Sequence, residues 1–167
     1  MKLNFPVLLL SALIPLAVGF VWYNPHVFGT VWMQASGVTE DMGKSANMPL
    51  IFGLTYLFSF FLACGMYFMV VHQTHVFSIL SKEKGLMEKG TEINTYYFDF
   101  LKKYGNNFRT FKHGVFHGVL GGLMLALPIV AINALFECKD CVYIAVNTGY
   151  WTVSMALMGG VICQFHK

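Results

Sequence analysis

Residues 114–136 read GVFHGVLGGLMLALPIVAINALF, an apolar run without Asp, Glu, Lys or Arg. A helix needs about 20 apolar residues to cross a hydrocarbon layer about 30 Å thick. Because no water is present in that layer to satisfy open backbone groups, a segment that crosses it must be helical. The run therefore predicts a membrane-spanning helix.

Three further stretches have the same character, at about residues 5–23, 49–71 and 142–163. Of the 167 residues, 56% are hydrophobic and only 11% are charged, whereas a soluble domain carries about 25% charged residues. This composition excludes a soluble globular protein, and the segments between the spans are too short for a second domain. We expect an all-α fold, an integral membrane four-helix bundle that forms one transmembrane domain over residues 1–167.

The basic residues predict the orientation of the bundle, because loops rich in Lys and Arg stay in the cytoplasm. Nine of the 11 basic residues fall on one side of the predicted spans, and Lys44 and Lys139 fall on the other. We therefore expect both chain ends and the long loop between the second and third spans to be cytoplasmic. The nine are Lys2, Lys82, Lys84, Lys89, Lys102, Lys103, Arg109, Lys112 and Lys167.

The first span also has features of a cleavable signal peptide. Lys2 precedes an apolar run, and Ala17-Val18-Gly19 offers small residues of the kind found at cleavage sites. The direct continuation into Trp22 favours a retained helix instead. Cleavage would not change the expected orientation, because the basic loop would stay inside in either case.

The loop between the second and third spans contains a periodic segment at residues 91–112. Its apolar residues recur at steps of three and four, which is typical of an amphipathic helix. Such a helix either lies in the headgroup plane or packs beneath a partner protein, and Gly105-Asn106-Asn107 favours a break near its end. The apolar residues are Ile93, Tyr97, Phe100, Tyr104, Phe108 and Phe111.

An aromatic motif, G-x-x-W-Y-x-P…F-G…W, follows the first span. Pro25 disfavours helical conformation in the residue before it and should end the span, while indole and phenol rings favour the headgroup level. We interpret the motif as an interfacial anchor that shapes the outer loop, with a ligand site on its rings as the alternative. Its residues are Trp22, Tyr23, Pro25, Phe28, Gly29 and Trp32.

Together with Gly37-Val38-Thr39-Glu40-Asp41-Met42, this motif resembles the signature of an uncharacterised bacterial family, domain of unknown function 1761. The specific part of the resemblance covers about residues 19–42. It implies a small four-helix protein of the bacterial inner membrane, and it implies no reaction.

Small residues form a stripe on the third span, where Gly114, Gly118 and Gly122 recur at steps of four. Such a stripe lets a second helix approach closely, and helices in membranes associate through this kind of contact. The partner is either another helix of the same bundle or a second subunit.

Histidines form the most suggestive cluster, at the cytoplasmic ends of the second and third spans. His72 and His75 are three residues apart and His113 and His117 are four apart, so each pair lies on one face of a helix. If the two pairs face each other, four imidazoles converge. Imidazole binds zinc, copper and iron, including haem iron, so the cluster predicts a transition-metal or haem site of structural, redox or transport function.

Cys138 and Cys141 lie in the short outer turn before the fourth span. An oxidising compartment favours a disulfide between them, and their spacing also occurs in thiol oxidoreductases. A thiol–quinone oxidoreductase is therefore a further interpretation. Such enzymes ordinarily relay electrons through a second outer cysteine pair, however, and the first outer loop has no Cys.

No other pattern indicates catalysis, so we expect a non-enzymatic membrane protein that acts as a homo-oligomer or as an accessory or scaffold subunit of a larger inner-membrane complex. Membrane lipid and other membrane subunits are the expected partners. A net charge of +3 is too small to indicate nucleic-acid binding. The metal- or haem-binding protein and the thiol–quinone oxidoreductase remain the alternatives.

Overall fold

A computed structural model describes residues 3–166, so the predicted cytoplasmic positions of Lys2 and Lys167 lie outside the described residues. This part of the chain is helical and contains no strand, as expected for an all-α fold. Its elements in chain order are α1 (Phe5–Ser11), α2 (Ile14–Trp22), η1 (Pro25–Gly29), α3 (Thr30–Ser36), α4 (Glu40–Ser45), α5 (Met48–Val70), α6 (Gln73–Leu80), α7 (Glu92–Tyr104), α8 (Phe111–Gly121), η2 (Gly122–Ala126), α9 (Leu127–Phe136) and α10 (Cys141–Phe165).

Three helical stretches among the described residues are long and apolar enough to cross a membrane. They are α1 with α2 (Phe5–Trp22), α5 (Met48–Val70) and the run α8–η2–α9 (Phe111–Phe136). The first stretch is interrupted before Pro15, whose nitrogen has no proton to donate to the helix. In the third, the π-helical turn η2 lies just before Pro128. The chain is therefore all-helical and suited to a membrane.

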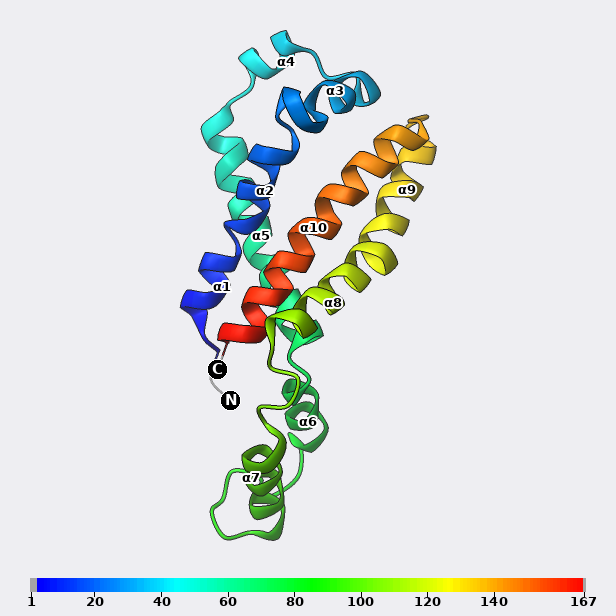
Figure 1. Cartoon of the computed structure of the whole chain (residues 1–167). Coiled ribbons are helices and arrows are strands. Elements are labelled where there is room, and N and C mark those ends of the chain that lie inside the picture. Colours follow the sequence, from blue (N-terminus) through cyan, green and yellow to red (C-terminus); the bar gives the residue numbers. More distant parts are fainter. Residues whose placement is uncertain (1–2, 167) are drawn as a thin grey trace.

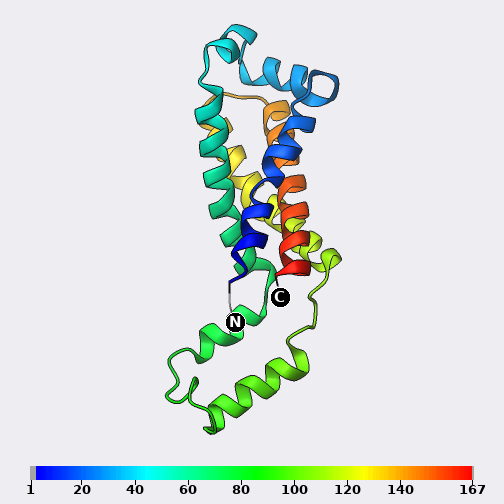
Figure 2. The ribbon, with the colours of Figure 1, turned by 90° about the vertical axis from the view of Figure 1, so that its left-hand side faces the viewer.

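The fourth predicted span, residues 142–163, lies within α10, which is not one of these three stretches. α10 has 25 residues but carries polar side chains such as Asn147 and Ser154. It lies at the centre of the bundle and contacts α1, α2, α5, α8 and α9 (Figures 1 and 2). Of its polar side chains, Asn147 bonds to Tyr23 and Trp32 of neighbouring elements, whereas the buried Ser154 hydroxyl has no partner.

The glycine stripe of α8 packs against α10 of the same chain. A Cβ atom on Gly114 or Gly118 would collide with backbone carbonyl groups of α10, and one on Gly122 would collide with Thr152. The stripe therefore makes the closest helix contact inside the bundle, and this face of α8 is not available to a second subunit.

α6 and α7 leave the bundle as a hairpin at the end where α1 begins and α10 ends (Figures 1 and 2). The periodic segment at residues 91–112 contains α7, which ends before Gly105, whereas its last two residues belong to α8. Tyr97, from the predicted apolar face, is 2% exposed and packs on Phe77 of α6, with ring centroids 6.1 Å apart. The apolar face of α7 is therefore used in contacts with α6, a helix that the periodicity does not predict.

Asn4, near the start of the chain, and His166, near its end, are in contact beside this hairpin. The backbone N–H of Asn4 donates to Nε2 of His166 at 2.8 Å, and the His166 ring lies 4.2 Å from that of Tyr67. His166 is 2% exposed, and burial lowers its pKa. The His166 ring is therefore neutral, and its Nε2 accepts the hydrogen bond from Asn4.

Candidate metal centre

Two breaks in the helices place three histidines together. α5 ends at Val70, and His72 lies in the connection where α6 begins. In the segment that follows α7, the Thr110 hydroxyl caps α8 by accepting from the backbone N–H of His113 at 3.3 Å. One turn further along α8, His117 faces the same side as His113.

The ring nitrogens of these three histidines converge. His72 Nε2 lies 2.9 Å from His113 Nε2 and 3.2 Å from His117 Nε2. All three ligand atoms lie within 4.8 Å of one another, and each residue is half-buried. The structure thus brings together one imidazole from the α5–α6 connection and two from α8.

His75 does not join the other three, although the sequence predicts a four-histidine cluster. Its side chain is exposed, and its ring centroid lies 6.2 Å from that of His72. The prediction assumes that both residues continue the helix of the second span. That helix instead ends at Val70 and α6 is a separate helix, and His75 is not part of the cluster.

The arrangement leaves a hydrogen-bonding conflict that a cation resolves. A neutral imidazole nitrogen has one in-plane position, holding either a proton or a lone pair, yet His72 Nε2 faces two other nitrogens. A metal ion accepts all three lone pairs at once. With metal–nitrogen bonds of about 2.0–2.1 Å, the ligand nitrogens of a tetrahedral site lie about 3.3 Å apart, close to the spacing seen here.

The electrostatics keep His72 available as a ligand. Burial lowers the pKa of His72, and the neighbouring His117 and His75 lower it further. A lowered pKa keeps the imidazole neutral at physiological pH, which is the form that binds metals. Among the described residues, no Asp, Glu or Cys belongs to the cluster.

A cavity of about 350 Å³ borders the histidine cluster and has no counterpart in the sequence-based predictions. Gln73, which follows His72, is 9% exposed, and its side-chain Nε2 donates to the Asn107 carbonyl at 3.1 Å. Its Oε1 has no partner. No sequence signal marks this glutamine, since its importance comes from burial. The cavity is lined by His72, Gln73, Val76, Phe100, Tyr104, Asn107 and Phe108.

The aromatic motif lies at the opposite end of the bundle and makes its polar contacts with α10. Trp22 Nε1 donates to the Val146 carbonyl at 3.1 Å. Tyr23 Oη and Trp32 Nε1 both donate to Oδ1 of Asn147, at 3.2 Å and 3.3 Å. These bonds fasten α2 and α3 to α10. We call Trp22, Tyr23, Trp32 and Asn147 the aromatic knot.

The other motif residues shape the turn around this knot. The chain is extended at Asn24 and re-enters a helical turn at Pro25, so α2 ends where the sequence predicts. Phe28 packs on Trp22, with ring centroids 4.5 Å apart. Gly29 touches the backbone of Tyr23 so closely that a Cβ atom would not fit.

The cysteine pair is not joined by a disulfide in the structure. Cys138 and Cys141 are both exposed and carry free thiols. The adjacent Lys139 instead donates to the Ser36 carbonyl at 2.6 Å, which ties this turn to α3.

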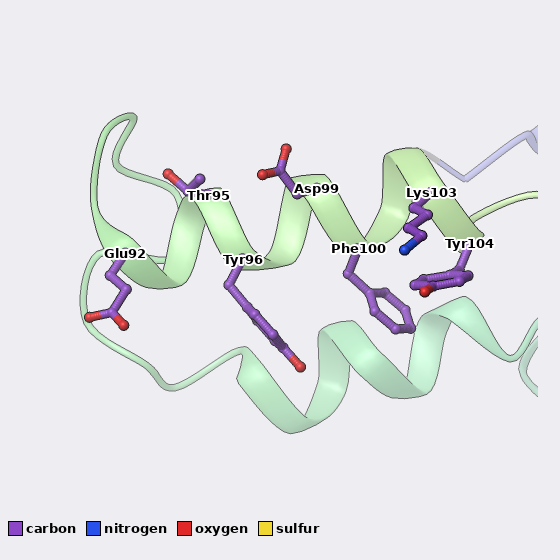
Figure 3. A pocket seen from close by; sticks show the side chains of 7 residues that line it. All are labelled: Glu92, Thr95, Tyr96, Asp99, Phe100, Lys103 and Tyr104. Carbon is purple, nitrogen blue, oxygen red and sulfur yellow. The ribbon is translucent and has the colours of Figure 1, made fainter.

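A shallow hollow of about 540 Å³ lies along α7 and is a weaker candidate for a site. Figure 3 shows Tyr96, Phe100 and Tyr104 pointing toward the neighbouring helix, whereas Thr95 and Asp99 point away from it. The polar groups of a small-molecule binding site converge on one point, whereas the polar groups of this hollow do not.

The family model described as "Protein of unknown function (DUF1761)" matches residues 7–163 of the chain. The chain belongs to this family. The range matched by the DUF1761 model includes both the aromatic knot and the three clustered histidines. No curated protein and no solved structure matches this DUF1761 chain.

Proposed function

We propose that this DUF1761 protein is an integral membrane protein that binds one divalent transition-metal ion through His72, His113 and His117. The single observation that carries the proposal is the convergence of His113 Nε2 and His117 Nε2 on His72 Nε2, which has one in-plane position for the two contacts. Imidazole ligands suit zinc, copper and nickel, and the lack of a clustered carboxylate disfavours magnesium and calcium.

The same geometry favours a bare ion over haem, the other cofactor expected from the histidines. A haem takes its axial imidazoles on the open faces of the macrocycle. Ring nitrogens 2.9 Å and 3.2 Å apart leave no gap in which a macrocycle fits.

The proposed setting is the bacterial inner membrane, with α10 as a fourth span and the metal centre on the cytoplasmic side. The support is the charge distribution, because the α6–α7 hairpin and its flanks carry seven of the 11 basic residues. In this orientation the chain ends lie beside the hairpin, and the aromatic knot lies at the outer face.

Metal analysis of the purified protein tests the proposal. The chain is purified in mild detergent through a tag without histidines, and bound Co²⁺ is measured by elemental analysis and by its visible spectrum. We expect one ion per chain. His72→Ala and His117→Ala should each weaken binding by at least about 100-fold, since removing even a residue that supports a ligand costs about 10–100-fold.

The matched control is His75→Ala, which removes an exposed imidazole close to the cluster but outside it. This variant should bind Co²⁺ like the wild type. Wild-type protein that binds no metal, or equal binding by all four proteins, would contradict the proposal.

The expected role as a homo-oligomer or accessory subunit is a second proposal, supported by the α6–α7 hairpin. Large apolar side chains there are exposed, among them Ile79 at 77% and Met87 at 72%. Exposed apolar groups outside the spanning helices are typical of protein contacts. They are a better candidate for a subunit contact than the glycine stripe, which α10 already covers.

Measurement of the particle mass in mild detergent tests this second proposal. We expect a protein mass, after subtraction of the bound detergent, above that of the 18.8 kDa chain, and Ile79→Glu should reduce it to the monomer. Met42→Glu is the matched control, because Met42 is 56% exposed at the opposite end of the bundle. A monomeric wild type without any co-purifying protein would exclude this role.

A further inference from the structure

The histidine cluster draws its ligands from two elements only, the α5–α6 connection and α8. Three protein ligands leave a divalent ion of this type with at least one open position. In metal sites of that kind, the open position holds water or a substrate, and it faces a cavity.

The cavity bordering His72 has the size and lining of a small binding site. Its volume is about 350 Å³, and none of its lining side chains is a carboxylate, lysine or arginine. Phe108 lines this cavity together with His72, and its ring centroid lies 5.2 Å from that of His113. The backbone of Phe108 is held at φ 61°, a conformation that non-glycine residues rarely adopt. Strain of this sort is concentrated at binding sites.

Gln73 lines the cavity and carries a buried polar atom without a hydrogen-bond partner. Its amide nitrogen is fixed by the Asn107 carbonyl, so the orientation of the amide group is set. Its Oε1 is buried without a donor, and a buried carbonyl oxygen without a hydrogen bond costs about 1–3 kcal/mol. An N–H or O–H group that reached this atom would remove that cost.

We propose that the metal ion keeps an exchangeable position that opens into this cavity, and that it takes a small uncharged nitrogen- or oxygen-donor molecule whose N–H or O–H group bonds to Gln73 Oε1. This inference rests on the proposed metal centre. Apart from the ion itself, the cavity offers no Lys or Arg to an anionic group, and the aromatic rings of Phe100 and Phe108 suit a flat ligand.

The test uses Co²⁺-loaded protein and two probes that differ in one group. Pyrazole offers a donor nitrogen next to an N–H, whereas 1-methylpyrazole offers the same donor nitrogen without that proton. Both are titrated while the visible Co²⁺ spectrum is recorded. We expect pyrazole to shift the spectrum and to bind about 3- to 10-fold more tightly than 1-methylpyrazole, the value of one hydrogen bond.

Variants assign this preference to the glutamine. Gln73→Met keeps the length of the side chain and removes its carbonyl oxygen, so the preference for pyrazole should disappear while Co²⁺ stays bound. Gln34→Met, on an exposed position of α3, is the matched control and should keep the preference.

The outcomes separate this inference from the proposed function. Failure of Co²⁺ to bind the wild type overturns both. Bound Co²⁺ with a spectrum that pyrazole does not change shows a closed site and overturns the inference alone. Equal binding of the two probes to the wild type also overturns it, and this readout does not depend on whether Gln73→Met folds.

Discussion

The two ends of the bundle both gather rings and polar atoms, but they differ in how the polar atoms are satisfied. In the aromatic knot, Asn147 Oδ1 accepts from Tyr23 and Trp32, and its Nδ2 donates to the Tyr143 carbonyl at 2.8 Å. In the histidine cluster, His72 Nε2 faces two ring nitrogens, and the neighbouring Gln73 Oε1 has no partner. A satisfied network stabilises a fold, whereas unsatisfied polar atoms beside a cavity are where a ligand could bind.

The largest expected effect comes from the close contact between α8, which carries two of the clustered histidines, and α10, which carries Asn147 of the aromatic knot. Gly118→Ala places a Cβ atom against the backbone of Met155 and Ala156 in α10, and such overpacking costs about 1–3 kcal/mol or more. We expect a fall in the midpoint of thermal unfolding in detergent and weaker Co²⁺ binding, since α8 carries two ligands.

Gly53→Ala is the matched control for this helix contact. Gly53 lies in α5 with nothing within 4 Å of an added Cβ atom. Alanine there should leave unfolding unchanged or raise its midpoint, because alanine favours helix over glycine. Equal effects of the two substitutions would show that the packing of α8 on α10 is unimportant.

Metal removal should affect the histidine end alone. Saturating a site at 100 times its dissociation constant stabilises a protein by about 2.7 kcal/mol. We expect chelation to lower the unfolding midpoint of the wild type and to leave that of metal-free His117→Ala unchanged. Tyr23→Phe, in the aromatic knot, should show the full drop. A chelator effect that persists in His117→Ala would place the metal elsewhere.

Asn147→Leu tests the aromatic knot. It removes the acceptor of two donors, and leaving buried donors unpaired should destabilise the fold by about 2 kcal/mol. Metal content should stay that of the wild type, because the knot and the metal centre lie at opposite ends of the bundle. Asn133→Leu, on an exposed position of α9, is the control and should be neutral. Loss of Co²⁺ binding in Asn147→Leu would show that the two ends are coupled.

The smallest effect should come from His166. Its pKa is lowered in the folded state, so the unfolded chain binds a proton more readily. The stability that its neutral ring contributes is therefore present above the ordinary histidine pKa of about 6.5 and is lost as the pH falls through the folded pKa. In metal-free protein, His166→Phe should reduce the fall of the unfolding midpoint between about pH 8 and about pH 5. An unchanged pH dependence would contradict this.

The sequence predicts the helical class and the long apolar helices because each apolar run carries its own signal. It also predicts the start of α4, where the Thr39 hydroxyl accepts from the Met42 N–H at 3.3 Å ahead of Glu40 and Asp41. Such caps depend on neighbouring residues only. The metal centre is predicted in part, because the pairing of His113 with His117 follows from helical spacing.

The remaining features depend on contacts between distant residues. The exclusion of His75 follows from the end of α5 at Val70, which no proline or glycine marks. The burial of Gln73 depends on Asn107, 34 residues away in the chain. Asn147 and Asn133 both lie in apolar runs of the sequence, yet Asn147 bonds to Tyr23 whereas Asn133 is exposed on α9.

The bond from Lys139 to the Ser36 carbonyl has a consequence for proteolysis. Lys44 and Lys139 are the only trypsin sites on the face opposite the basic loop. The Lys44 side chain is 72% exposed on a short helix, whereas the Lys139 ammonium is held at 2.6 Å by the neighbouring loop. Trypsin applied to that face alone should therefore cut after Lys44 first and divide the chain into one short and one long fragment.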